Sequence, residues 1–451
     1  MVRKNFKSRN LFLKLNPAHI LVLGFLGLIL IGTFLLMLPI STQGSHHLSF
    51  VDALFEATSA VCVTGLAVVD TGTTFTLFGQ IVLLILIQLG GWGFMTSGIL
   101  MFLILRKKIG IKKRLLLQES INSLSLQGII KLVQRIIVIT LVLELIGALV
   151  LAIRWSYEMP WTKAIYYGVF HSISAFNNAG FGLEPDNLSK WVGDPIVNAM
   201  ITSLFICGGI GFIVILDIIK KRKIRDLSLH TKLVLVSTLF LNIVSFVIIL
   251  YLEYNNPATL GTLPINDKMW AAYFQGVVTR TAGFNTIDIG QMTISSQVFM
   301  IALMFIGASP GSTGGGIKVT TAILLILSVV AIIRNREEIH IFKRRVPQNL
   351  VKRALAIVTT AVMFIFTIVF LLTITEKSAE LSQILFETVS AFSTAGLSAG
   401  LTGDLTQVGR ILITIMMFIG RLGTLTMAFA LAMAKSDHSK IRYAEEKILI
   451  G

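Results

Sequence analysis

The sequence predicts an all-α membrane protein of four tandem helix–pore loop–helix repeats, with eight spans and four re-entrant pore loops around one pseudo-fourfold pore. The 451-residue chain is 54% hydrophobic and only 14% charged, whereas soluble domains carry roughly 25% charged residues. Long apolar runs recur along the chain, and one short glycine-containing motif recurs four times. These three observations predict the fold class.

Eight apolar runs are candidates for crossing the membrane. Most of them reach the roughly 20 residues that a helix needs to cross a hydrocarbon core of about 30 Å. The first run follows a basic arm and is longer than the apolar core of a signal peptide, so we expect it to be retained as a spanning helix. The runs are 18–40, 81–105, 136–153, 196–219, 233–252, 319–333, 354–375 and 411–434.

Positive charge is concentrated between and outside pairs of these runs. The net charge is +16, and 30 of the 39 lysines and arginines lie in 3–14, 106–135, 220–232, 334–353 and 435–447. Basic clusters beside spans mark the cytoplasmic side of a membrane. We therefore expect a multi-pass protein in contact with lipid, with both termini in the cytoplasm, and we do not expect nucleic-acid binding.

The basic clusters divide the chain into four quarters, 1–110, 111–225, 226–345 and 346–451. Consecutive cytoplasmic clusters must be joined by an even number of crossings, so each quarter holds two spans. A short apolar segment lies between the two spans, and such segments are typical of re-entrant elements that line a cavity or are buried in protein. The four segments are 49–64, 162–179, 267–282 and 379–395.

The four re-entrant segments share one motif. Aligned on their glycines, they read FEATSAVCVTGL (55–66), FHSISAFNNAGF (170–181), YFQGVVTRTAGF (273–284) and FETVSAFSTAGL (386–397). The glycines are spaced 115, 103 and 113 residues apart. Recurrence at near-equal spacing indicates internal repeats and disfavours the simpler interpretation that each glycine only ends a short helix.

These loops are suited to coordinating a dehydrated alkali cation. Rings of backbone carbonyls replace the water shell of K⁺ in selective filters, and glycine permits the unusual dihedral angles that such loops require. The C-terminus of a preceding short helix favours a cation. We predict filter loops at 62–66, 177–181, 280–284 and 393–397, with ion-binding residues Thr64, Gly65, Asn178, Ala179, Gly180, Thr281, Ala282, Gly283, Thr394, Ala395 and Gly396.

The second helix of the third quarter is interrupted by GASPGSTGGGIK at 307–318, between apolar halves at 294–306 and 319–333. Such backbone cannot face lipid, so we predict a gate inside the bundle, beneath the filter. A phosphate-binding loop is disfavoured, because Ile317 interrupts the motif and the flanks are membrane helix. The gate residues are Gly307, Ser309, Pro310, Gly311, Ser312, Thr313, Gly314, Gly315, Gly316 and Lys318.

A second glycine register interrupts the second helix of each quarter, at 90–93, 208–211, 307–310 and 420–423. Glycine at these sites permits close helix packing. Arg421 lies in the fourth register, at the depth of the predicted gate. We expect its charge to oppose cation passage and to tether the loop; the alternative is a buried arginine that bonds carbonyls without influencing conduction.

Other ionisable side chains lie near the four filter glycines, and such groups at membrane depth are usually functional. Glu56 and Glu387 stand nine residues before their glycines, where the other quarters have His171 and Phe274. Arg280 stands three residues before its glycine. We expect Arg280 to support the pore helix, either by reaching the outer interface or by pairing with a carboxylate, and His171 to be a hydrogen-bonded packing residue.

These features resemble the superfamily of K⁺ transporters that includes bacterial TrkH and KtrB and the fungal and plant Trk and HKT proteins. The filter motifs VTG, NAG, TAG and TAG, the loop GASPGSTGGGIK and the segment FIGRLGT carry the resemblance, which covers nearly the whole chain. TrkH proteins usually have two additional N-terminal helices, so the KtrB branch is the closer match. Some plant relatives with serine at the first filter glycine prefer sodium, so Gly65 implies potassium.

The resemblance implies sodium-stimulated potassium uptake across the plasma membrane of a bacterium, by a homodimer with one pore in each subunit. It implies a cytoplasmic ring of regulator-of-conductance (RCK) subunits, KtrA, that bind ATP, ADP and often cyclic-di-AMP. We expect no nucleotide to be bound by this chain, because its longest cytoplasmic segment is only a few tens of residues. By position, the resemblance implies K⁺ at the filter glycines Gly65, Gly180, Gly283 and Gly396, a gate at 307–318 and a positive barrier at Arg421.

Two other classes of function are alternatives to a potassium-conducting protein. An alternating-access cation cotransporter also contains broken helices, but usually as a corresponding pair in inverted repeats, whereas these four repeats share one orientation. A membrane enzyme is disfavoured, because the sequence has no recognisable paired carboxylates, metal cluster or nucleophile constellation.

Overall fold

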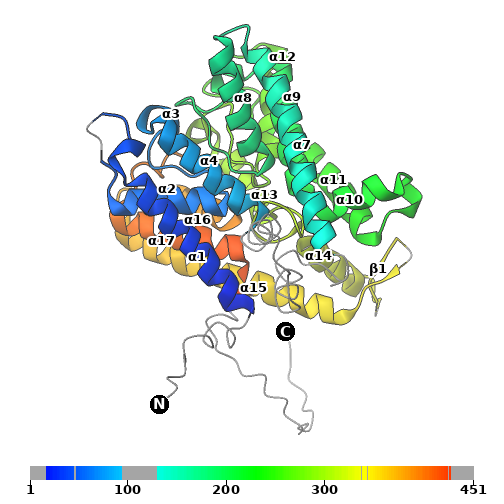
Figure 1. The fold of residues 1–451 in the computed structure, drawn as a ribbon. Coiled ribbons are helices and arrows are strands. Elements are labelled where there is room, and N and C mark those ends of the chain that lie inside the picture. The colour runs from blue at the N-terminus through cyan, green and yellow to red at the C-terminus, as the bar shows by residue number, and fades with distance from the viewer. Residues whose placement is uncertain are drawn as a thin grey trace, which may run out of the picture.

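The structure is a computed structural model that describes residues 17–44, 47–93, 129–336, 338–342, 344–424 and 426–427. The described chain is mostly helical and consists of four repeats, each with a first helix, a pore helix and a second segment that begins with a further helix (Figure 1). The basic clusters at 3–14 and 435–447 and most of 106–135 lie outside the described residues.

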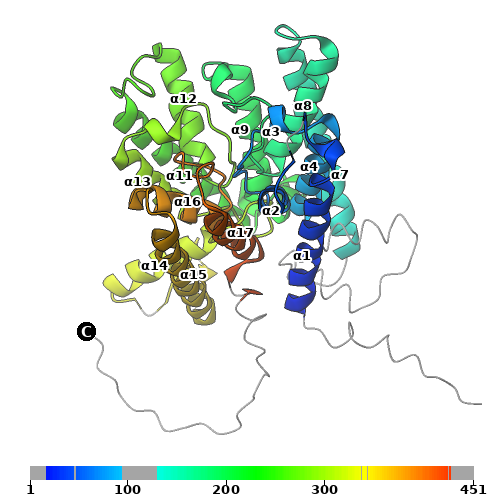
Figure 2. The ribbon, with the colours of Figure 1, turned by 90° about the vertical axis from the view of Figure 1, so that its left-hand side faces the viewer.

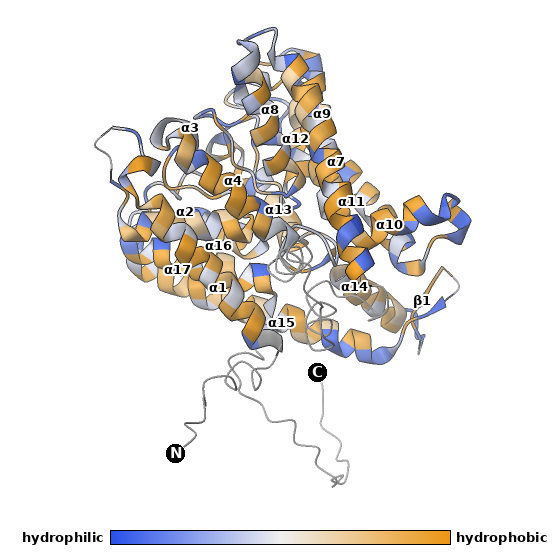
Figure 3. Cartoon of the chain, in the orientation of Figure 1, coloured by the Kyte–Doolittle hydropathy of each residue, from blue (hydrophilic) through white to orange (hydrophobic). Residues whose placement is uncertain are grey.

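The first helix of each repeat is long and apolar enough to cross a membrane. Large apolar side chains on these helices are exposed, for example Phe366 at 71%, as expected of a surface that faces lipid. Apolar residues dominate along them in Figure 3, while hydrophilic residues gather at the α10–α11 turn. The four helices are α1 (Pro17–Leu36), α7 (Ile129–Trp155), α11 (Leu229–Glu253) and α15 (Gln348–Thr375).

The pore helices confirm the four predicted re-entrant segments. They contain 13 to 16 residues, too few to cross a bilayer at 1.5 Å per residue. Each packs against the first helix of its own repeat. The four are α2 (Phe50–Cys62), α8 (Trp161–Phe176), α12 (Ile265–Val278) and α16 (Leu381–Ser393).

Within the described residues, a helix of the second segment ends at or just before the second glycine register in each repeat. In repeat 2 the interruption expected at 208–211 is a sharp bend, because α9 and α10 meet at 95° around Gly211. The parts of the expected spans 81–105 and 411–434 beyond the breaks lie largely outside the described residues. The elements are α4 (Leu77–Trp92), α9 (Pro195–Ile210), α10 (Phe212–Lys221), α13 (Ile294–Phe305), α14 (Val319–Ile333) and α17 (Gln407–Leu422).

Short elements connect the helices. A two-stranded antiparallel hairpin pairs His340 with Arg345 inside the basic cluster 334–353. The strands are β1 (His340–Ile341) and β2 (Arg344–Arg345), the short helix is α3 (Thr71–Thr74), and the 3₁₀ turns are η2 (Pro39–Ser41), η3 (Ser189–Trp191), η4 (Ile224–Asp226) and η5 (Ile289–Gln291).

The four repeats close into a ring. The second segment of each repeat packs on the pore helix of the next: α4 on α8, α9 on α12, α13 on α16, and α17 on α2. The last of these contacts joins the fourth repeat to the first, and Figure 2 shows α17 beside α2. A closed ring with four inward pore helices creates a single central axis, as the repeats predicted.

Candidate functional site

The four predicted filter loops have the same backbone conformation. In each loop a non-glycine residue adopts a left-handed conformation, and the filter glycine two residues later has a φ between +72° and +97°. Side chains rarely tolerate such angles, so glycine is the appropriate residue. The pairs are Val63 and Gly65, Asn178 and Gly180, Thr281 and Gly283, and Thr394 and Gly396.

The four filter glycines meet at one place. A Cβ atom added to Gly283 would lie 2.8 Å from the Cα of Gly180, and one added to Gly396 would lie 2.8 Å from the Cα of Gly283. A Cβ added to Gly65 would lie 3.2 Å from the Cα of Gly180. Residues more than 300 positions apart therefore converge on the axis, where a side chain has no room.

Backbone carbonyls surround this meeting point. A Cβ on Gly283 would lie 3.1 Å from the carbonyl oxygen of Thr64 and 3.4 Å from that of Ala179. A Cβ on Gly396 would overlap the Thr64 oxygen, and one on Gly65 would overlap the Ala179 oxygen. Inward carbonyls are the ligands that replace the water shell of a cation in a filter.

A cavity of about 270 Å³ opens beside the filter and is lined by both Gly65 and Gly180. Asp70 and Glu184 contribute carboxylates to its wall, and Asn187 donates from Nδ2 to the carbonyl oxygen of Gly180 at 3.1 Å. The carboxylates make this mouth attractive to cations. The sequence argument missed Asn187, because it lies outside the repeated motif.

Loop 307–318 contacts the filter from the other side. Thr313 Oγ1 donates to Asn178 Oδ1 at 2.8 Å, and the backbone N–H of Gly315 donates to Thr394 Oγ1 at 2.9 Å. A Cβ on Gly314 would overlap Thr281 Oγ1. The predicted gate thus touches the left-handed residues of three of the four filter loops.

The loop is also fastened to the break in repeat 2. Ser309 and Thr313 donate their backbone N–H groups to the carbonyls of Gly209 and Gly208, at 3.0 and 3.2 Å. The N–H of Phe212 donates to the carbonyl of Gly311 at 2.9 Å. These bonds pair the backbone freed by the broken second helix of repeat 2 with the loop from repeat 3.

Two cationic side chains bind carbonyls of the loop. Lys318 Nζ donates to the carbonyl of Gly314 at 2.6 Å, within its own loop. The Arg421 guanidinium donates to the carbonyls of Thr313 and of Gly90 in α4. Arg421 therefore links the loop to repeat 1, as expected of a tether. The alternative interpretation, a buried arginine that bonds carbonyls without influencing conduction, predicts the same bonds.

Glycines of the second register permit close helix packing, as expected. A Cβ on Gly90, Gly208 or Gly420 would overlap a backbone carbonyl oxygen four residues before the corresponding filter glycine. Those carbonyls belong to Val61, Phe176 and Phe392. In repeat 3 a Cβ on Gly307 would instead overlap the carbonyl of Gly315, so there loop 307–318 occupies the place of the packed helix.

Arg280 is buried and neither reaches the outer interface nor pairs with a carboxylate among the described residues. Its guanidinium donates to the Thr238 carbonyl and hydroxyl, both at 3.2 Å, and to Asn242 Oδ1 at 3.3 Å. All three acceptors lie on α11. Neutral oxygens of α11 therefore bind the guanidinium. Both predicted arrangements, contact with the outer interface and pairing with a carboxylate, were wrong.

A carboxylate that we did not single out lies behind the second filter loop. Asn177 Nδ2 donates to Glu144 Oε1 at 2.9 Å and to Gln88 Oε1 at 3.0 Å. Glu144 is buried in the middle of α7. Glu144 is the one charged residue in the apolar run 136–153, and a charge at that depth is the signal from which the sequence could have identified this site.

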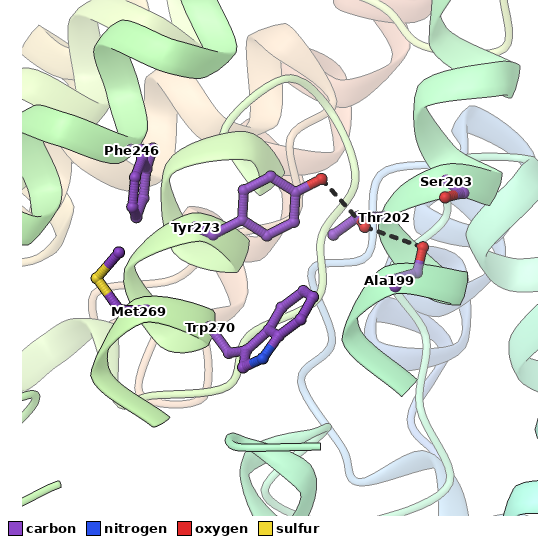
Figure 4. Close-up of a pocket in the computed structure, with 7 residues that line it drawn as sticks. All are labelled: Ala199, Thr202, Ser203, Phe246, Met269, Trp270 and Tyr273. Carbon is purple, nitrogen blue, oxygen red and sulfur yellow. Dashed lines mark hydrogen bonds between the residues drawn. The ribbon is translucent and has the colours of Figure 1, made fainter. Parts of the chain in front are cut away.

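A separate pocket of about 360 Å³ lies between α9, α11 and α12, away from the filter (Figure 4). Phe246, Met269, Trp270 and Tyr273 line it, and Tyr273 donates from its hydroxyl to Thr202 Oγ1 at 3.4 Å. None of the predicted site residues lines this pocket.

Comparison with known proteins identifies the family. Residues 7–441 match the family described as TrkH, cation transport protein. The chain is 50% identical to Ktr system potassium uptake protein B of Bacillus subtilis, over 98% of both chains, and 41% identical to the protein of that name from Vibrio alginolyticus, over 96% and 94%.

Two further similarities extend this comparison. The chain is 37% identical to the potassium/sodium uptake protein NtpJ of Enterococcus hirae, over 97% and 98% of the two chains. The crystal structure of the potassium transporter TrkH from Vibrio parahaemolyticus has the same fold, with a TM-score of 0.73 at 19% identity, over 95% of this chain and 86% of that one. The protein with this fourfold ring of glycine loops belongs to the TrkH family of cation transport proteins.

Proposed function

We propose that this chain carries potassium ions into a bacterial cell across the plasma membrane, through a channel-like filter formed by loops 62–66, 177–181, 280–284 and 393–397. The observation that carries the proposal is the convergence of four positive-φ glycines, one from each repeat, on one axis. Further support comes from relatives named as potassium uptake proteins. Each quarter, 1–110, 111–225, 226–345 and 346–451, supplies one wall.

Loop 307–318 is the gate in this proposal. An ion that leaves the filter on this side meets Thr313 and Gly315 directly, because both bond to filter residues. Arg421 holds the carbonyl of Thr313 and adds positive charge below the filter. Movement of the loop away from the axis therefore opens the pathway.

Control of the gate is assigned to partners. Two relatives are named as parts of a Ktr system, which supports a cytoplasmic RCK-type subunit that binds ATP or ADP beside this chain. A third is named a potassium/sodium uptake protein, which supports sodium as an activator. The protein functions as a homodimer in this scheme, with both termini in the cytoplasm.

Rubidium uptake into liposomes that contain the purified full-length protein tests the proposal. A potassium gradient should drive rubidium influx that excess external potassium inhibits and excess sodium does not. Electrical current in a planar bilayer would separate conduction from alternating access. Influx that sodium inhibits as strongly as potassium, or absence of influx even after deletion of loop residues 314–316, would overturn the function proposed.

A further inference from the structure

The position nine residues before each filter glycine, here the backing position, is fully buried in every repeat. Its occupants are Glu56, His171, Phe274 and Glu387, all with 0% exposure. Two carboxylic acids, an imidazole and a phenyl ring thus occupy equivalent sites behind the filter. Burial of three polar side chains at membrane depth is costly unless each has a hydrogen-bonding role.

Both carboxylates at the backing position accept hydrogen bonds from the chain just beyond the filter. Glu56 Oε1 accepts from the backbone N–H of Val68 at 2.7 Å, and Glu387 Oε1 accepts from that of Ala399 at 3.1 Å. Both donors are the third residue after the filter glycine. Glu387 also accepts from Thr402 Oγ1 at 2.7 Å.

Histidine performs the same task in repeat 2. His171 Nδ1 lies 2.9 Å from the carbonyl oxygen of Tyr167. A carbonyl only accepts, so Nδ1 carries the proton and Nε2 is free to accept. The backbone N–H of Leu183, again the third residue after the glycine, donates to Nε2 at 3.4 Å.

Repeat 3 lacks this bond. Phe274 has no acceptor, and the hydroxyl of Thr286, the third residue after Gly283, has no hydrogen-bond partner within the described ranges. The end of the pore helix differs as well. In the other repeats the residue before the filter glycine donates its N–H to the carbonyl five residues earlier, at 2.8 Å, but Ala282 donates to Val278, four residues earlier, at 3.2 Å.

We propose that Glu56, His171 and Glu387 are positioning residues that fix the outer part of three filter loops and so determine ion preference. The repeat-3 loop, without this bond, is the adaptable wall. Discrimination between K⁺ and Na⁺ depends on where the carbonyls are held, and supporting hydrogen bonds hold such sites in place. The inference rests on the proposed function, since it concerns the selectivity of that filter.

Paired substitutions test the acceptor role. Glu387→Gln keeps an acceptor oxygen, whereas Glu387→Met keeps similar bulk and removes it. Rubidium influx in liposomes and its inhibition by sodium are measured for the full-length protein. We expect the Gln variant to stay within about twofold of wild type in rubidium-over-sodium preference. We expect the Met variant to lose about tenfold in that preference, because the loop donors that bond to Glu387 are then left without an acceptor.

The repeats supply their own control. His171→Phe copies repeat 3 and keeps the ring contacts with Trp155 and Phe284, so we expect lower preference without loss of flux. Phe274→Leu removes no acceptor and should leave the preference unchanged.

Wild-type preference in both Glu387→Met and His171→Phe would overturn the inference. A fall in flux with unchanged preference in either variant would also overturn it, because that result indicates only a structural role. If Glu387→Met fails to fold, His171→Phe decides alone. Failure of the wild-type protein to select rubidium over sodium would instead refute the proposed function.

Discussion

The filter and the layer beneath it differ in symmetry. At the filter, all four repeats contribute a left-handed residue and a positive-φ glycine in the same order. Beneath it, one loop from repeat 3 contacts the filter residues, and one arginine from repeat 4 binds that loop. Coordination of an ion by a ring needs equivalent oxygens, whereas a gate needs a segment that can leave the axis. The repeats are therefore alike at the proposed ion-binding ring and differ at the proposed gate.

The largest effect is expected from a substitution at a filter glycine, where the four repeats are alike. Gly396→Ser places a side chain at a φ of +77° and against the carbonyl of Thr64. A left-handed non-glycine residue costs about 1–3 kcal/mol before any overlap, so we expect at least about a tenfold loss in potassium-over-sodium preference. Rubidium and sodium uptake in a strain deficient in potassium transport measures it.

Gly44→Ser is the matched control for that change. Gly44 also has a positive φ, of +68°, but an added Cβ would have nothing within 4 Å. Its backbone strain is comparable, and it lies outside the filter loops and outside the segment that bonds to Glu387. Equal losses in the two variants would show that backbone strain, and not the filter, explains the result.

Shortening loop 307–318, which only repeat 3 contributes, should change flux instead of ion preference. Deletion of 314–316 removes the residues that contact Thr281 and Thr394. We expect rubidium flux per protein to rise several-fold, up to about tenfold, with less dependence on a cytoplasmic partner and with the ion preference retained. A variant that reaches the membrane and conducts no faster than wild type would contradict the gating role of the loop.

Arg421 should show a smaller effect of the same sign. Lowering an energy barrier by about 1.4 kcal/mol raises a rate tenfold. Pore water screens the Arg421 charge and reduces its contribution to the barrier, so we expect Arg421→Ala to raise maximal flux a few-fold. Arg421→Lys keeps the charge but not the planar guanidinium that binds two carbonyls. The flux of this variant should therefore lie nearer the wild-type flux. A fall in flux per protein in both variants would indicate a purely structural arginine.

The smallest effect is expected from one neutral hydrogen bond. Thr313→Val removes the donor to Asn178 Oδ1, and a neutral hydrogen bond at the low end of the range is worth about 0.5 kcal/mol, so flux should rise by no more than about twofold. Ser312→Ala is the control, because its hydroxyl bonds inside the loop to the carbonyl of Ser309 at 2.6 Å. If the two variants behave alike, the contact between the loop and Asn178 does not hold the gate closed.

The broken helix of repeat 2 was only partly predicted from sequence: the glycines at 208–211 indicated an interruption, but not the angle of the bend. Residues 196–219 form a continuous apolar run, and apolar composition alone does not distinguish a straight span from a bent one. The bend at Gly211 is accompanied by a bond from the N–H of Phe212 to the carbonyl of Gly311, a residue 100 positions later in the chain. Contact with loop 307–318 stabilises this break.

The sequence by itself determined the number of repeats, the short pore helices and the glycines of the filter. These features are local: run length, motif spacing and the dihedral freedom of glycine can each be recognised within a few residues. Tertiary structure decided which groups meet. The contact of α17 with α2, the neutral oxygens around Arg280 and the bond between Asn177 and Glu144 all depend on packing between distant segments, because helix periodicity specifies which face is apolar but not which partner covers it.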